Sequence, residues 1–402
     1  MLHRVVVTGI GVVSPYGAGF DLLMKGLFEG RSALRYSKEL GFVVGSIPDS
    51  VDFSRWTAGQ QREMCRASLL SLLAAEEAMS SADGIEDHSS TLVNIGACMA
   101  DLEHIGATAE QVKKGEIRKI SPYFVPRILN NLPAGYVAMK YKMLGGVEST
   151  STACATGVHC IGNAFRAVRH GYARRALAGS AESCVNPISL AGFHRMRALA
   201  TGDSPQISRP FDNKRSGFVL SEGVGLLLME RLEDAQKRGA NILAEVLGYG
   251  ISSDAYHISS PDPSGIGAQL SMQRAIEDAK LKSKDINYVN AHATSTPAGD
   301  SVEADAIRNR FSANQQRPIA VSSIKGHIGH LLGAAGSVET IATIGCIRDR
   351  KLPANLNLEQ SDVGEKLNLL TQTVDWPDKR RVAIVNSFGF GATNASLVVG
   401  EI

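Results

Sequence analysis

A single cysteine lies among small residues in the segment STSTACATG, residues 149–157. A cysteine that only fills a core usually has bulky apolar neighbours, and Cys154 has none beside it. Apolar residues then recur at helical spacing from Val158 to Val168, before Gly171, so we predict a helix with Cys154 at its N-terminus. The free N–H groups and the dipole there favour a thiolate. Two interpretations stay open from this segment: a displayed nucleophile, or a structural cysteine in a strand-to-helix turn.

Two further segments place ionisable side chains where apolar strands end. His292 follows a strand in VNAHATSTPAGD, although a lone histidine is more often structural. Lys325, His327 and His330 lie in a glycine-rich turn before a helix, in VSSIKGHIGHLLGAAG. Polar groups at strand ends, close to a helix N-terminus, are placed to contact a ligand rather than to fill a core.

A zinc site made of His292, His327 and His330 is the alternative to a catalytic cluster, because imidazoles can supply three zinc ligands. However, no carboxylate or cysteine lies at a recognised metal-motif spacing, and the Lys325 ammonium would compete with a cation. The TGIGVVSP turn after the first strand does not continue a G-x-G-x-x-G dinucleotide loop. We therefore expect neither a metal nor a cofactor.

Short β-rich runs alternate with helical patterns along the chain, which predicts an α/β fold with layers around buried sheets. The segment EGVGLLLMERLEDAQKRGANILAEVLGYG reads as strand, helix and strand near the midpoint, so we place a boundary between halves 1–240 and 241–402 there. Near the C-terminus, glycines in NSFGFGATNAS would let backbone N–H groups approach a ligand closely. The helical patterns cover 66–82, 158–170, 231–239, 267–281 and 333–350.

The bulk charge does not favour a nucleic-acid or membrane-surface partner, because 42 Lys and Arg against 40 Asp and Glu leave a net charge of +2. No apolar run approaches the ~20 residues of a membrane span. The six cysteines show no C-x-x-C spacing, and the chain enters a strand pattern at once, without a secretory signal. We expect a protein of a reducing, interior compartment.

Four segments, in register over nearly the whole chain, resemble the β-ketoacyl-acyl-carrier-protein synthases of elongating type. They are TACATGVH with Cys154, NAHATSTPAGD with His292, KGHIGHLLGAAGSVE with Lys325 and His330, and NSFGFGATN. Initiating synthases have an asparagine where this chain has His330. A thiolase would have a second catalytic cysteine near the C-terminus, and Cys346 lies in no such motif.

The resemblance implies a thiolase-type fold, in which two similar halves stack as five layers, α-β-α-β-α, and form a homodimer. It implies that Cys154 takes an acyl group from a carrier thioester, and that His292 and His330 stabilise the enolate formed when malonyl-carrier is decarboxylated. The backbone N–H groups of Cys154 and Phe390 would bind the oxyanion. Lys325 would stabilise this cluster, and Glu339 would hold the cluster in position without contacting the substrate.

Further residues match the family in the acyl pocket and at the surface. Met99, Phe193 and Phe390 would line or gate the pocket, and Phe124 would approach the pocket of the partner subunit. The acyl carrier protein is acidic, and it would dock on Arg62, Arg118 and Lys119.

The Ala293 version of the histidine motif, with AESCVNPISLAGF, is closest to the mitochondrial branch. We therefore expect the mitochondrial matrix, with the bacterial cytoplasm as the alternative. A thiolase-like acyl-CoA acyltransferase and a carrier-binding scaffold without catalysis are the competing functions.

Overall fold

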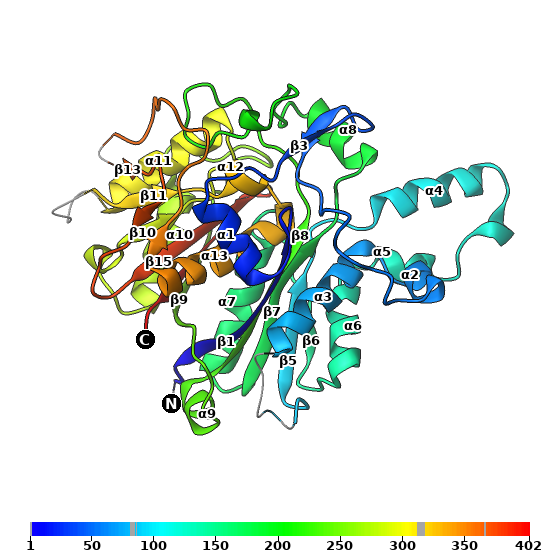
Figure 1. The fold of residues 1–402 in the computed structure, drawn as a ribbon, viewed down its shortest axis with the longest axis horizontal. Helices are drawn as coiled ribbons and strands as arrows, with labels where there is room; N and C mark the ends of the chain where they lie inside the picture. Colours follow the sequence, from blue (N-terminus) through cyan, green and yellow to red (C-terminus); the bar gives the residue numbers. More distant parts are fainter. Residues whose placement is uncertain (1, 81–84, 86, 312–317, 366) are drawn as a thin grey trace.

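The computed structural model describes residues 2–80, 85, 87–311, 318–365 and 367–402. Strands and helices alternate along the chain (Figure 1), which confirms the predicted α/β class. The strands are β1 (Val5–Ser14), β2 (Gly17–Ala18), β3 (Arg35–Ser37), β4 (Phe42–Val44), β5 (Thr91–Gly96), β6 (Val147–Glu148), β7 (Arg175–Glu182), β8 (Gly223–Arg231), β9 (Ala244–Ser253), β10 (Tyr288–Asn290), β11 (Ala320–Ser322), β12 (Lys351–Leu352), β13 (Asn368–Leu369), β14 (Val374–Asp375), β15 (Val382–Gly389) and β16 (Thr393–Gly400).

The α-helices lie between these strands, and several of them coincide with the helical patterns of the sequence. The helices are α1 (Phe20–Phe28), α2 (Ala58–Glu63), α3 (Arg66–Ser80), α4 (Leu102–Lys113), α5 (Phe124–Ile128), α6 (Leu132–Tyr141), α7 (Thr156–Arg169), α8 (Pro187–Arg195), α9 (Leu232–Lys237), α10 (Ile266–Asp278), α11 (Pro297–Phe311), α12 (Lys325–Ile328) and α13 (Ala335–Asp349).

The two halves of the main sheet repeat one strand order. The order is β6-β5-β7-β8-β1 in one half and β11-β10-β15-β16-β9 in the other, with β13 beyond β11. In each half the first three strands are parallel and the next two are antiparallel. Antiparallel pairing of Val5–Val7 with Ala244–Val246 joins β1 to β9, so the halves form one continuous sheet. The repeat confirms the prediction of two similar halves.

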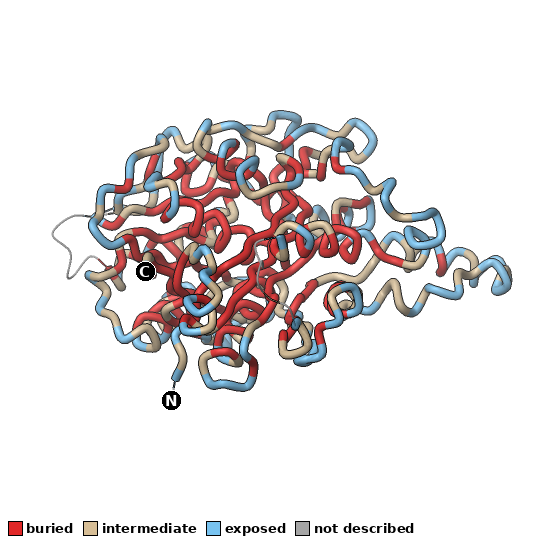
Figure 2. Tube along the Cα trace, turned by 60° about the horizontal axis from the view of Figure 1, so that its bottom comes forward, coloured by how far each residue is buried: buried red, intermediate tan, exposed pale blue. Residues whose placement is uncertain are grey.

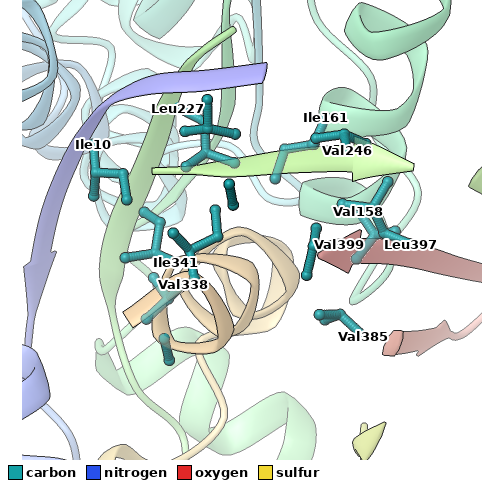
Figure 3. Packing of buried hydrophobic residues seen from close by; sticks show 14 of the residues in the cluster. Ile10, Val158, Ile161, Leu227, Val246, Val338, Ile341, Val385, Leu397 and Val399 are labelled. Atoms are coloured by element: carbon teal, nitrogen blue, oxygen red, sulfur yellow. The ribbon is translucent and has the colours of Figure 1, made fainter. Parts of the chain in front are cut away.

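Helices cover both faces of each half, which produces the predicted order α-β-α-β-α. The outer layers are α3 with α6 on the first half, and α10 with α11 on the second. The middle layer consists of α7 and α13. Figure 3 shows Val338 and Ile341 of α13 and Val158 and Ile161 of α7 packed among strand side chains. All four are fully buried, so this layer contributes much of the hydrophobic stabilisation.

The segment before α13 differs from the expected turn. Residues Lys325–Ile328 form the short helix α12, which ends at Gly329 with a positive φ of 73°. A side chain is disfavoured in that conformation, so glycine allows the chain to leave the helix and reach His330. The helix therefore ends between Lys325 and His330, and His330 pairs with Leu220 in an isolated β-bridge.

One arm projects from the layered body. It consists of α4, the 3₁₀ turn Ile117–Lys119 and α5, and it extends away from the sheet (Figure 1). Figure 2 shows the arm largely exposed, whereas the strands are buried. Among the described helices, none has the length and apolar character needed to cross a membrane.

Candidate active site

Cys154 lies in the tight turn that leads into α7. The helix begins at Thr156, and Ala153 has a positive φ of 48°, which is strained for a residue with a Cβ. The Thr156 hydroxyl accepts a hydrogen bond from the Thr152 N–H at 2.9 Å and donates one to the Ala153 carbonyl at 2.7 Å. These bonds hold the turn in place, so the position of the cysteine is set by local structure.

His330 and His292 face this cysteine from the second half of the molecule. The His330 Nε2 atom lies 3.0 Å from Cys154 Sγ. The two imidazole rings are 5.4 Å apart between centroids and inclined at 81°. The main chain of His330 is anchored, since its N–H donates to the Val219 carbonyl at 2.8 Å and its carbonyl accepts from the Ser221 N–H at 3.0 Å. The structure thus brings together three residues that are distant in the sequence.

Lys325 and Glu339 form a buried ion pair behind the histidines. The Lys325 ammonium also donates to the His292 carbonyl at 2.6 Å. Glu339 belongs to α13, so Lys325 connects the His292 loop to a central helix. The ion pair therefore positions His292 and supplies a positive charge close to it.

Burial controls the ionisation of the three residues that face one another. It raises the pKa of Cys154 to about 12, although the Lys325 ammonium acts in the opposite direction. Burial, with Lys325, also holds the pKa values of His292 and His330 well below their usual range. The resting pair at neutral pH is therefore a thiol beside a neutral imidazole. Burial thus acts against the thiolate form that the helix N-terminus is predicted to favour.

The hairpin between β15 and β16 packs against the Cys154 turn. A Cβ at Gly389 would lie 2.8 Å from the Thr152 carbonyl oxygen and 3.2 Å from the Ala155 nitrogen, so a side chain would force the two segments apart. The Ser387 hydroxyl donates to the Cys154 carbonyl at 2.8 Å. Glycine thus permits the close backbone approach that the NSFGFGATNAS segment predicts.

A cavity of about 520 Å³ opens in front of Cys154. Met99, Phe193 and Phe390, which the resemblance assigns to an acyl pocket, line this cavity together with His292 and His330. Phe218 also lines it, and its ring packs edge-on against His330 at 5.2 Å. A partly apolar cavity with a few convergent polar groups is typical of a small-molecule site.

Comparison with known proteins identifies the family. The family model described as Beta-ketoacyl synthase, N-terminal domain, matches residues 2–235, and the one described as Beta-ketoacyl synthase, C-terminal domain, matches residues 243–359. The chain belongs to the β-ketoacyl synthase family. Among similar synthases, the mitochondrial 3-oxoacyl-[acyl-carrier-protein] synthase of Arabidopsis thaliana is 40% identical, over 100% of this chain and 94% of the relative. The 3-oxoacyl-[acyl-carrier-protein] synthase 2 of Rhizobium meliloti is 41% identical, over 99% of both chains.

Solved structures of β-ketoacyl synthases share this fold over their whole length. A β-ketoacyl synthase from Burkholderia phymatum has a TM-score of 0.91 and 31% identity, with 100% of both chains covered. A type II polyketide ketosynthase, solved in complex with its acyl carrier protein and bound to the hexaketide, has a TM-score of 0.91 and 28% identity over 100% of both chains. The predicted thiolase-type fold is confirmed.

Several residues that the resemblance selects lie outside the cavity of this synthase. Phe124 begins α5 on the projecting arm, where its ring lies 5.7 Å from that of His104. Arg62 is exposed on α2, and Arg118 and Lys119 are exposed on the 3₁₀ turn of the arm. None of these four residues lines the cavity, so their roles depend on what binds to the surface.

Two other residues singled out in the sequence do not line the cavity. His327 is fully buried in α12 and does not join the cluster of Cys154, His292 and His330, so the structure does not bring together the zinc trio considered above. Cys346 is fully buried in α13 and does not line the cavity. It is therefore not placed as a second thiolase-type cysteine.

Sequence reasoning missed a buried carboxylate that holds the His292 loop in the synthase. Glu303 of α11 accepts hydrogen bonds from the N–H groups of His292 at 2.9 Å and Ala293 at 2.7 Å. Burial raises its pKa to about 7. The sequence places Glu303 eleven residues after His292 in a helical segment, which could have suggested a contact with the His292 loop. However, an acidic residue on a helix is usually exposed, so a buried role was not predicted.

A second missed carboxylate lies behind the nucleophile. Glu182, at the end of β7, is buried and accepts from the thiols of Cys98 at 2.7 Å and Cys184 at 2.9 Å. It also accepts from the Cys98 N–H at 3.1 Å. Because Cys98 lines the cavity, Glu182 fixes part of the wall that faces the substrate.

Proposed function

We propose that this protein is an elongating 3-oxoacyl-[acyl-carrier-protein] synthase, which extends a Cys154-bound acyl group by two carbons from malonyl-carrier. The observation that carries the proposal is the contact of His330 Nε2 with Cys154 Sγ at 3.0 Å, with His292 beside it. A cysteine with two histidines serves both an acyl transfer and the stabilisation of an enolate.

Acylation begins when Cys154 Sγ attacks the thioester carbon of the acyl-carrier. The thiol proton passes to His330 Nε2, which is at hydrogen-bond distance, and then to the sulfur of the departing carrier. The backbone N–H groups of Cys154 and Phe390 bind the oxyanion, and Gly389 allows their segments to approach each other. The product of this half-reaction is a thioester on Cys154 and a free carrier thiol.

Condensation requires a carbanion equivalent from malonyl-carrier. The bond to the carboxylate breaks, carbon dioxide leaves, and its electron pair forms an enolate whose oxygen accepts hydrogen bonds from His292 and His330. The enolate carbon then attacks the acyl carbon, and the Cys154 sulfur leaves. Lys325, paired with Glu339, holds the His292 loop in place and provides positive charge near the enolate.

The deciding experiment supplies the protein with acyl-carrier and malonyl-carrier. We expect carbon dioxide release and a β-ketoacyl-carrier that is two carbons longer. Acyl-CoA in place of the carrier substrates tests the thiolase-like alternative. If the protein with its natural Cys154 forms no product from either set of substrates, the non-catalytic scaffold is the function that remains. A series of acyl chain lengths in the same assay measures the preference of the cavity.

For its compartment, we propose the mitochondrial matrix, where the carrier is a separate acidic protein. The proposal is supported by the 40% identity to the mitochondrial Arabidopsis thaliana synthase, while the 41% identity to the Rhizobium meliloti synthase supports the bacterial cytoplasm as the alternative. Immunolocalisation against a matrix marker distinguishes the two.

We also propose a homodimer, formed through the free edge of the sheet at β6. Val147 of this edge strand is exposed, as are the nearby apolar side chains of Met139 and Leu144. An unpaired strand edge with exposed apolar residues is a ready pairing surface. Light scattering should give twice the chain mass for the unchanged protein, and the mass of one chain for Leu144→Glu with Val147→Glu. Tyr172→Glu is the control: Tyr172 is exposed like these residues, and its substitution should leave the dimer intact.

A further inference from the structure

The cavity contains a cluster of potential metal ligands. Cys154, His292 and His330 form a group whose Sγ and imidazole nitrogen donor atoms all lie within 4.8 Å of one another, and within the described residues no other such group of cysteine, histidine or acidic side chains is found. We propose that these three side chains bind a divalent cation of Zn²⁺ type, which blocks the site reversibly by occupying the place of the acyl group.

The donor set suits zinc. Thiolate and imidazole are ligands that Zn²⁺ prefers, and three protein ligands with one open position are typical of accessible zinc sites. Bond lengths of about 2.0–2.3 Å in a tetrahedron require donor atoms roughly 3.3–3.7 Å apart. The distance from His330 Nε2 to Cys154 Sγ is 3.0 Å, slightly below this range. No two of the three donor atoms are more than 4.8 Å apart, which is slightly above it. Small side-chain rotations therefore bring all three donors onto one ion.

Access and charge also permit a cation. The three ligands line the 520 Å³ cavity, so an ion can enter without unfolding the chain. The Lys325 ammonium opposes a cation, but Glu339 pairs with it and offsets its charge. Glu303 adds a carboxylate to the cavity wall. The absence of a sequence motif is no obstacle, because the ligands come from three separate segments of the chain.

Binding is a ligand exchange that balances without a redox partner. The six-coordinate aqueous ion loses five of its six waters and gains bonds to Cys154 Sγ and to one nitrogen each of His292 and His330. The Cys154 S–H bond breaks and its proton goes to the buffer. A water keeps the fourth position, and the sulfur can no longer attack a thioester; this last consequence rests on the proposed function.

The test measures metal binding directly, without any substrate. The chelator-treated protein is titrated with Co²⁺, followed by its thiolate-to-metal charge-transfer absorption, and with Zn²⁺ in competition with a chromophoric chelator. We expect one equivalent bound, and at least a tenfold weaker affinity for each of Cys154→Ser, His292→Ala and His330→Ala. His257→Ala is the matched control, because His257 is exposed and lines the same cavity outside the cluster.

A second measurement needs no variant. One equivalent of Zn²⁺ should protect Cys154 of the unmodified protein from alkylation by iodoacetamide, as identified by peptide mass. Unchanged alkylation, absence of the charge-transfer band, or equal losses of affinity in His257→Ala and the ligand variants would overturn the proposed metal site. Carrier-dependent condensation would be unaffected by that outcome, so the failure of one proposal is distinguishable from the failure of the other.

Discussion

At the scale of single residues, the environment of Cys154 suppresses the charge that its chemistry requires. Burial raises the pKa of the thiol to about 12, and the adjacent imidazoles are held neutral. Nucleophilic attack must therefore coincide with transfer of the proton to His330. A neutral imidazole retains one N–H, which His292 can donate to the enolate oxygen; His330 can do so when its proton is on Nε2, the atom that faces Cys154.

Substitutions should separate the two half-reactions. Cys154→Ser should abolish the acyl adduct because the hydroxyl is a far weaker nucleophile. His292→Ala should lower carbon dioxide release by about 10²-fold or more while the adduct still forms, since only the later step develops charge on an enolate. His330→Ala should impair both half-reactions, because His330 takes the thiol proton during acylation and donates to the enolate oxygen later. Mass spectrometry of the intact protein measures the adduct, and labelled malonyl-carrier measures decarboxylation; an adduct on Cys154→Ser at the normal level would contradict the assignment.

At the scale of elements, α7 connects the nucleophile to both halves of the sheet. His159 of this helix contacts the Tyr249 hydroxyl at 2.7 Å and the Thr393 hydroxyl at 3.1 Å. Tyr249 belongs to β9, and Thr393 begins β16, next to the Phe390 hairpin. The imidazole thus links the Cys154 helix to the hairpin that contains Phe390, the proposed second oxyanion donor.

This fastening should depend on pH. Burial lowers the pKa of His159 to about 4, below the ordinary value of 6.5 that applies in the unfolded chain. The stabilising contribution of a group with a lowered pKa is present above pH 6.5 and is lost as the pH falls toward 4, by at most about 3 kcal/mol. Denaturant unfolding at several pH values should show that His159→Gln loses less stability over this window than the unchanged protein. Identical pH profiles would contradict the assignment.

The middle layer should be sensitive to small cavities. Ile341 of α13 is fully buried between strands and helices, so Ile341→Ala should lower the free energy of unfolding by about 2–5 kcal/mol. Ile258→Ala is the control, because that side chain is 78% exposed and its loss should change stability by less than about 0.5 kcal/mol. Denaturant titration measures both, and equal effects would show that the layer is not closely packed.

At the scale of the whole molecule, the proposed carrier-docking residues on the projecting arm are separate from the cluster of Cys154, His292 and His330. Arg118 and Lys119 are exposed on the arm, and the reacting residues are buried in the body. Lys119 is partly engaged by Glu116 at 2.8 Å, whereas Arg118 has no ion-pair partner among the described residues. Exposed charges of this kind affect the rate of encounter more than the chemical step.

Charge reversal should reveal the docking surface. Arg118→Glu with Lys119→Glu should raise the apparent KM for acyl-carrier several-fold, more strongly at low salt, and leave activity with a small uncharged acyl thioester unchanged. Lys379→Glu with Arg380→Glu is the matched control, since this adjacent pair is equally exposed and lies elsewhere in the chain. Equal effects on both substrates would show that the arm residues support the fold instead.

The sequence by itself determined the elements and the candidates for the reacting residues. Apolar periodicity and helix stop signals are local properties, so α7 and α13 lie within about two residues of their predicted bounds. Cys154, His292, Lys325 and His330 were candidates because each stands where a strand or turn meets a helix, and the resemblance to the synthases then implied their roles. The boundary near residue 240 and the docking role of Arg62 remain predictions.

Only the tertiary structure decided how these residues meet. Cys154 and His330 are 176 positions apart in the chain, and their 3.0 Å contact depends on the packing of α7 against α13 between the two halves of the sheet. The protonation state of Cys154 could not be predicted from the sequence either, because the pKa of a thiol depends on its burial. Glu303 was missed for the same reason: helical spacing does not show that a carboxylate is buried and bound to the His292 backbone, since desolvation and hydrogen bonding arise only when distant segments pack together.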